Sequence, residues 1–155
     1  MPILPSAPPR AVAEELTAHV TRLNLLLRSE LAPQGVSLAQ ASTLATLSQR
    51  GPTRMTELAA AAAVAQPSMS ALIKRMERQG WVRRSSALSD QRAVEVVITG
   101  PGARLLAELR EARSAALGRH LGRLAAADQE LLAQAAGSLG RLVESIEEEA
   151  TGRAR

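Results

Sequence analysis

A run of small polar and basic side chains occupies residues 66–78 of the chain. Apolar residues recur within it at helical spacing and define one face of a predicted helix: Met69, Leu72, Ile73 and Met76. The hydrogen-bonding and charged residues fall outside that face: Gln66, Ser68, Ser70, Lys74, Arg75 and Arg78. Amides and hydroxyls can bind base edges, and lysine and arginine can bind phosphates. This pattern favours contact with a nucleic acid, although an ordinary amphipathic helix with a solvated basic face remains an alternative.

A second basic group belongs to a predicted β-hairpin that follows this helix. Gly80 is expected to end the helix, and residues 81–84 form the first strand. Residues 85–91 are polar and typical of a turn, and the alternating residues 94–98 form the second strand. The hairpin is therefore expected to have a basic base and a polar tip.

Positive charge is concentrated in the same part of the chain. The formal net charge of the 155 residues is +4, and residues 54–92 carry seven basic and three acidic side chains. Residues 100–150 carry six basic and eight acidic ones. The distribution indicates a polyanionic partner for the middle of the chain and none for its C-terminal end. Charge alone would equally fit a solvated basic surface.

Several functional classes lack their characteristic residues. The absence of cysteine excludes disulfides and thiolate metal sites. The two histidines, His19 and His120, are only weak evidence for a metal-binding site. We find no G-x-S-x-G motif and no phosphate-binding glycine loop, so we expect no enzymatic activity and no cofactor. No apolar run approaches the roughly 20 residues of a membrane span, and residues 1–9 are a poor signal peptide, so we expect a cytoplasmic location.

Three further helices are predicted ahead of residue 66. The first covers residues 10–35, and the second begins with a capping box of Ser37 and Gln40 and ends before Gly51. The third is short, covering residues 55–63. A short helix that braces a second one is the arrangement of a helix-turn-helix.

Two long helices, over residues 101–125 and 128–149, are predicted after the hairpin. Their expected buried positions are Leu105, Leu106, Leu109, Ala116, Leu117, Leu121 and Leu124, followed by Leu131, Leu132, Ala135, Leu139, Leu142, Val143 and Ile146. Together with the first helix they carry more apolar surface than one small domain can cover. We therefore expect an obligate homodimer.

The motif TELAAAAAVAQPSMSALIKRMERQGWVRR, followed by SDQRAVEVVIT, resembles the MarR (multiple antibiotic resistance regulator) family. The resemblance implies that Gln66, Pro67, Ser68 and Ser70 contact the major groove of DNA. It also implies that Arg92 enters the minor groove and that Asp90 holds the wing loop. Arg84, in the first strand of the hairpin, is a further expected DNA contact of the wing. A local ion pair without a DNA role is the alternative for Asp90 and Arg92.

The resemblance implies a mainly α fold with a small β-hairpin wing, that is, a winged helix-turn-helix between N- and C-terminal dimerisation helices. The expected parts are an irregular arm over 1–9, a dimerisation helix over 10–35, a DNA-binding lobe over 36–100, dimerisation helices over 101–149 and a frayed tail over 150–155. The implied function is a homodimeric transcriptional regulator, a repressor, on a pseudo-palindromic operator in double-stranded DNA. A winged-helix protein-interaction module without DNA binding is the alternative.

The sequence departs from the family pattern at three positions. Ala63 replaces a turn glycine, Ala65 replaces a capping serine, and Ala71 stands where many relatives carry arginine. Because the chain lacks cysteine, tyrosine and phenylalanine, we expect either no effector or a small lipophilic or anionic one. Arg22 or Arg28 is the expected anion anchor.

Overall fold

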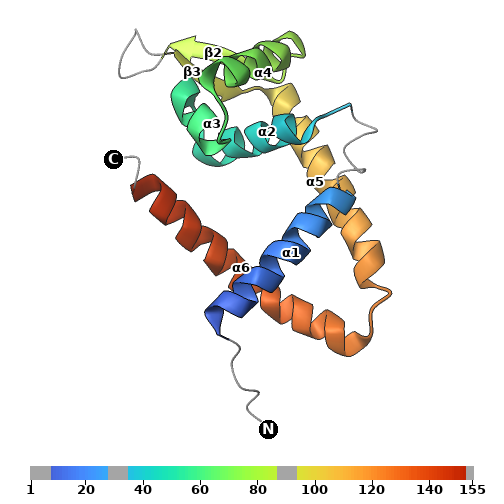
Figure 1. Cartoon of the computed structure of the whole chain (residues 1–155). Helices are drawn as coiled ribbons and strands as arrows, with labels where there is room; N and C mark the ends of the chain where they lie inside the picture. The colour runs from blue at the N-terminus through green and yellow to red at the C-terminus, as the bar shows by residue number, and fades with distance from the viewer. Residues whose placement is uncertain (1–7, 28–34, 87–93, 153–155) are drawn as a thin grey trace. The chain divides into compact units, whose positions relative to one another are not determined.

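The computed structural model describes residues 8–27, 35–86 and 94–152, which divide into two compact units, residues 1–114 and 115–155 (Figure 1). The helices and strands follow one another as α1 (Pro9–Leu26), α2 (Leu38–Arg50), β1 (Thr53–Arg54), α3 (Met55–Ala61), α4 (Gln66–Arg78), β2 (Val82–Ser86), β3 (Val94–Ile98), α5 (Gly100–Leu121) and α6 (Ala126–Gly152). The predicted class, mainly helical with a small β component, is confirmed.

Helix α2 begins at the predicted capping box. The Gln40 backbone N–H donates to Ser37 Oγ at 3.2 Å, and the Ser37 N–H donates to Gln40 Oε1 at 2.8 Å. The Gln40 amide nitrogen also donates to Gln79 Oε1, at the end of α4, at 3.1 Å. One buried glutamine therefore caps its own helix and fixes that helix against the end of another.

The β component is a three-stranded antiparallel sheet in the order β1-β3-β2, rather than the predicted two-stranded hairpin. Thr53 and Arg54 of β1 pair with Val96 and Glu95 of β3. Two residues are too short to display an alternating pattern, so no local signal could predict this strand. Thr53 is buried, and its hydroxyl donates to the Gly51 carbonyl at 2.9 Å.

Strand β2 extends beyond its predicted end at residue 84. Ser85 and Ser86, which were expected in a turn, pair with Glu95 and Val94 of β3. Polar residues are tolerated there because β2 lies at the edge of the sheet, and β3 completes the hydrogen-bond ladder regardless of side-chain type. The base of the wing is therefore longer than the sequence predicts.

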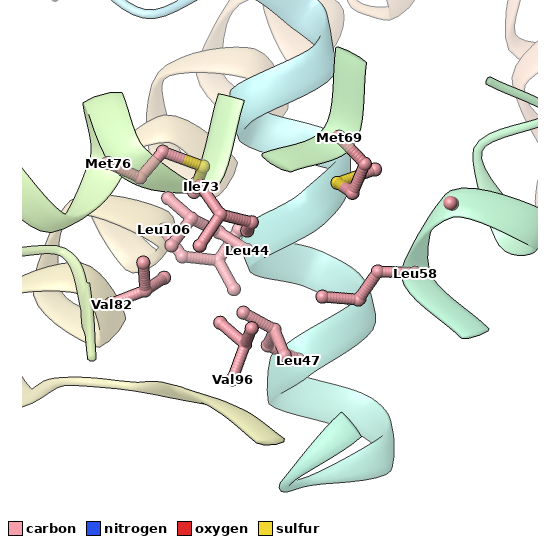
Figure 2. Close-up of a cluster of buried hydrophobic side chains, with 10 residues drawn as sticks. Leu44, Leu47, Leu58, Met69, Ile73, Met76, Val82, Val96 and Leu106 are labelled. Atoms are coloured by element: carbon pink, nitrogen blue, oxygen red, sulfur yellow. The ribbon is translucent and has the colours of Figure 1, made fainter. Parts of the chain in front are cut away.

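The predicted apolar face of α4 packs into the main core. Met69, Ile73 and Met76 are fully buried, and Leu72 is partly buried. Figure 2 shows Ile73 and Met76 beside Leu44 of α2. Other members of the cluster come from α2, α3, both long strands and α5: Leu47, Leu58, Ala59, Val82, Val96 and Leu106. This core is built without an aromatic ring at its centre and fixes α4 on α2 and the sheet.

The C-terminal helices differ from the prediction in length and burial. Helix α5 ends at Leu121 and α6 already begins at Ala126, so Leu124 lies in the turn between them. On α5, Leu106, Leu109 and Ala116 are buried as expected. The large apolar residues expected to be buried on α6 are instead 41 to 63 % exposed: Leu131, Leu132, Leu139, Leu142, Val143 and Ile146. The prediction that these α6 residues are buried is therefore wrong for a single chain.

Thr99 joins the end of α4, the start of β2 and the start of α5. Its hydroxyl donates to the Gly80 carbonyl at 2.6 Å, and its N–H donates to the Trp81 carbonyl at 3.0 Å. The same hydroxyl accepts the Gly102 N–H at 3.2 Å, which caps α5. A Cβ at Gly102 would overlap the Trp81 carbonyl oxygen, so the close approach requires glycine at this position.

Gly102→Ala should destabilise the fold by about 1–3 kcal/mol, because the added methyl group forces α5 away from Trp81. Urea unfolding followed by circular dichroism measures this change. Gly100→Ala is the matched control: its Cβ would meet only Arg104 Nη1 at 3.7 Å, so its effect should stay within about 0.5 kcal/mol. Equal effects of the two substitutions would contradict the close-approach argument.

Candidate nucleic-acid interface

Helix α4 presents its polar residues on the side away from the core. All six residues singled out by the sequence lie on this helix: Gln66, Pro67, Ser68, Ser70, Lys74 and Arg75. Five of them are exposed, and Ser70 is half-buried. Pro67 lies in the first turn, where its missing N–H removes no hydrogen bond. The first turns of α4 therefore offer amide and hydroxyl groups, and its later turns offer lysine and arginine.

The turn before α4 keeps its geometry despite the alanine at position 63. The Ala63 N–H donates to the Ala60 carbonyl and the Val64 N–H to the Ala59 carbonyl, both at 3.0 Å, which is the Schellman ending of a helix. Ala63 takes a left-handed φ of 50°. The end of α4 uses the same bonding with Gly80 at the left-handed position. The turn that positions the first residues of α4 is therefore strained at Ala63.

Ala65 occupies the N-cap of α4, and no side chain caps the helix there. An uncapped helix start leaves backbone N–H groups without an intrahelical acceptor. Here Pro67 has no N–H and the Ser68 N–H donates to the Ala65 carbonyl at 3.0 Å, so the Gln66 N–H and the positive end of the helix dipole remain for a phosphate oxygen. The missing serine thus lowers the stability of the free helix and leaves its start available to an anion.

An ion pair joins α4 to β2. Arg84 Nε of β2 lies 3.3 Å from Glu77 Oε2 of α4, and their side chains are 43 % and 29 % exposed. Such a partly exposed pair contributes little to stability. Its geometric effect is to hold the Arg84 guanidinium beside α4 at the base of the wing.

Of the remaining predicted site residues, the structure describes only Arg22. Asp90 and Arg92 of the wing, and Arg28, lie outside the described residues. Arg22 lies on α1 and is exposed. Arg113 of α5 was not among the residues predicted from the sequence, and its Nε and Nη2 atoms are buried with no hydrogen-bond partner among the described residues. No local signal distinguishes this arginine from the exposed ones on the same helix.

Two cavities flank the start of α2. The larger, of about 700 Å³, lies between α2, the turn after α3 and α4, and Ser68 and Arg75 are among its lining residues. The smaller, of about 250 Å³, lies between α2 and α5 and includes Arg113. Leu38 and Ser42 of α2 line both. The first turns of α2 therefore separate the Arg113 cavity from the flank of α4.

The described part of the chain offers neither a metal-binding cluster nor a membrane-spanning helix. It contains no group of three or more histidine, cysteine, aspartate or glutamate residues placed to hold a metal ion. None of its helices has both the length and the apolar content needed to cross a bilayer.

The MarR family model matches residues 36–94, from the residue before the α2 capping box to the start of β3. An HTH-type transcriptional regulator of Mycobacterium tuberculosis is 33 % identical over 133 residues, which are 86 % of this chain and 93 % of the relative. The chain belongs to the MarR family.

Solved structures share the fold of this chain. A transcriptional regulator from Thermotoga maritima matches with a TM-score of 0.72 at 24 % identity, over 88 % of this chain and 96 % of that one. A substituted form of S. aureus MepR, bound to an oligodeoxyribonucleotide, matches with a TM-score of 0.61 at 18 % identity, over 90 % and 99 % of the two chains. The described elements α2 to β3 correspond to the winged helix-turn-helix expected from the sequence.

Ala63→Gly should stabilise the protein by about 0.5–1 kcal/mol. The left-handed backbone conformation costs roughly 1–2 kcal/mol for a residue with a Cβ, and removing that Cβ relieves this strain. The extra conformational freedom of glycine in the unfolded chain offsets part of the gain. The neighbouring Ala62 is the matched control, because its φ of −87° is unstrained. Ala62→Gly should therefore destabilise by about 0.5–1 kcal/mol. Thermal unfolding measures both variants. If their melting temperatures shifted in the same direction, the inferred strain at Ala63 would be refuted.

Proposed function

We propose that this MarR family regulator binds double-stranded DNA sequence-specifically as a homodimer and acts as a transcriptional repressor. The exposed polar start of α4, held by the buried face of the same helix, is the observation that carries the proposal. A helix fixed in this way can enter a major groove without unfolding its own core. The alternative, a protein-interaction module, gives no reason for small polar groups and basic residues to share one exposed helix surface.

Residues of α4 divide into two roles in this proposal. Gln66, Ser68 and Ser70 lie in its first two turns and contact base edges, where a glutamine amide pairs best with adenine. Lys74 and Arg75 lie further along and contact phosphates, which sets the position of the helix in the groove. The uncapped N-terminus beside Pro67 adds the Gln66 backbone N–H for one phosphate.

The wing adds a second contact to DNA. Arg84, held beside α4 by Glu77, lies close enough to the recognition helix to contact the phosphates bordering the same groove. We assign the minor groove to Arg92, with Asp90 ordering the wing loop around it. An arginine in a narrow A·T-rich minor groove is attracted by its enhanced negative potential, so the wing senses groove shape rather than base edges.

A second copy of the chain is the partner proposed for the apolar surfaces of α1 and α6. Helix α1 has no buried residue, and the large apolar residues of α6 are exposed along its length. Soluble monomers rarely expose large contiguous apolar patches. Association through these helices gives a twofold dimer, and a twofold dimer requires a pseudo-palindromic operator.

A small lipophilic or anionic effector completes the proposal. A compound that prefers one spacing of the two recognition helices would change DNA affinity by its differential affinity for that state. Of the two anchors expected from the sequence, Arg22 is exposed on α1 and available for a ligand carboxylate.

Three substitutions separate the proposed DNA contacts in fluorescence anisotropy titrations. Gln66→Ala should weaken the binding free energy by about 1–3 kcal/mol, and only for DNA that carries the base preferred at that position. Arg75→Ala should weaken binding to all sequences alike and reduce the slope of log affinity against log salt by about one unit. Arg92→Ala should weaken binding and flatten the preference for A·T-rich flanks.

Arg123→Ala is the matched control, because Arg123 is exposed in the turn between α5 and α6, away from the winged helix-turn-helix in sequence. It should leave affinity and sequence preference unchanged. The assignment of the interface would be wrong if Arg123→Ala and Arg75→Ala had the same effect. The wing assignment would be wrong if Arg92→Ala changed neither affinity nor flank preference.

A further inference from the structure

We infer that the hydrogen bond between Gln40 of α2 and Gln79 at the end of α4 sets the direction of α4, and through it the discrimination between DNA sequences. Both glutamines are positioning residues, since they act at the end of α4 opposite the residues proposed to contact base edges. Neither was among the site residues predicted from the sequence. This role rests on the DNA-binding function proposed above.

The cap of α2 fixes the polarity of this hydrogen bond. An amide side chain offers one oxygen and one NH2 group. Gln40 Oε1 accepts the Ser37 N–H at 2.8 Å, so the Gln40 amide nitrogen is left to donate to Gln79 Oε1, at 3.1 Å. Because Gln40 is only 3 % exposed, solvent has little access to replace Gln79 as the acceptor. A displaced end of α4 would leave a buried donor unpaired, which is unfavourable.

A second anchor holds the end of α4 one residue further along. The Gly80 carbonyl accepts the Thr99 hydroxyl at 2.6 Å. The end of α4 is therefore tied to α2 through Gln79 and to the start of α5 through Gly80. The start of α4 differs, because Ala65 provides no side-chain cap and Ala63 in the preceding turn has a left-handed φ of 50°. These two side-chain anchors therefore lie at the end of α4 that is farther from the proposed base contacts.

The length of α4 turns a small tilt at its end into a larger displacement at its start. Gln66 and Gln79 are separated by about 20 Å along the helix, at 1.5 Å per residue. A tilt of about 5° at Gln79 would therefore move Gln66 by about 1.7 Å. Hydrogen bonds to base edges form only over donor–acceptor distances of about 2.7–3.2 Å. The direction of α4 thus decides whether the base contacts proposed for its first turns can form.

Phosphate contacts depend less on this direction. They are mainly electrostatic and independent of sequence, whereas base contacts require hydrogen-bond geometry. Loss of the bond between Gln40 and Gln79 should therefore weaken binding to the operator and leave binding to unrelated DNA nearly unchanged. A general loss of folded protein would weaken both. The ratio of the two dissociation constants therefore separates a positioning role from a structural one.

Fluorescence anisotropy titrations of the full-length protein test this role. The two probes are a duplex carrying the sequence protected on the protein's own promoter region and a scrambled duplex of the same composition. Gln79→Met removes the acceptor and keeps an unbranched side chain at an exposed position. It should raise the dissociation constant for the operator by about two- to tenfold, the range of one net hydrogen bond. The constant for the scrambled duplex should change by less than about twofold.

Gln79→Glu is the conservative variant, because its carboxylate oxygen can accept from Gln40 in place of Oε1. Its added negative charge should weaken binding to both duplexes alike, so the ratio of the unaltered protein should be retained. The matched control is Gln49→Met, at an exposed glutamine of α2, which should change neither dissociation constant. The inference would be overturned if Gln79→Met kept the ratio, or if Gln79→Glu reduced it as much as Gln79→Met.

Trp81 provides a second readout in the absence of DNA. It is the single tryptophan of the chain, lies two residues after Gln79 and packs against the core while partly buried. Release of the end of α4 should admit water to its ring, so Gln79→Met should shift its fluorescence emission to longer wavelength. Gln79→Glu and Gln49→Met should leave the emission unchanged. An unchanged emission in Gln79→Met would show that the bond does not hold the end of α4.

Failure of this role and failure of the proposed function give different results. If the unaltered protein prefers the operator and Gln79→Met keeps that preference, the positioning role is wrong and the DNA-binding function stands. If the unaltered protein binds both duplexes equally, the sequence-specific function itself is wrong. The emission of Trp81 then still tests whether Gln40 holds the end of α4.

Discussion

The close approach of α5 to the backbone of Trp81 is the constraint on which the winged helix-turn-helix depends. It is possible only because Gly102 has no side chain, and Thr99 fixes it with hydrogen bonds to Gly80, Trp81 and Gly102. The same few residues end α4, start β2 and start α5. A displacement of α5 at this point must therefore move α4 and the wing together.

Composition sets a second constraint. The chain contains one tryptophan and no tyrosine or phenylalanine, so its core consists of small and aliphatic side chains. Such a core suffices for α2 to α5, where methionine and leucine side chains fill the space between helices and sheet. It leaves α1 and α6 with exposed apolar residues, and the proposed second copy supplies the burial that these two helices lack.

Local signals predicted much of the fold and part of the candidate site. The capping box of Ser37 and Gln40, the helix end at Gly80 and the apolar face of α4 depend on neighbours within a few residues, and each was confirmed. Strand β1 and the extension of β2 depend on pairing with β3, which short-range patterns do not encode. The burial of Arg113 likewise depends on how α2 and α5 pack, and sequence alone could not distinguish it from exposed arginines on α5.

DNase I footprinting of the protein on its own promoter region tests the central claim most directly. A twofold dimer that places α4 in two successive major grooves should protect two symmetric half-sites whose centres lie about 10 bp apart, on one face of the duplex. The protected sequences should be related by a pseudo-dyad. An isolated asymmetric half-site would contradict the dimer, and no protection at low salt would contradict sequence-specific DNA binding itself.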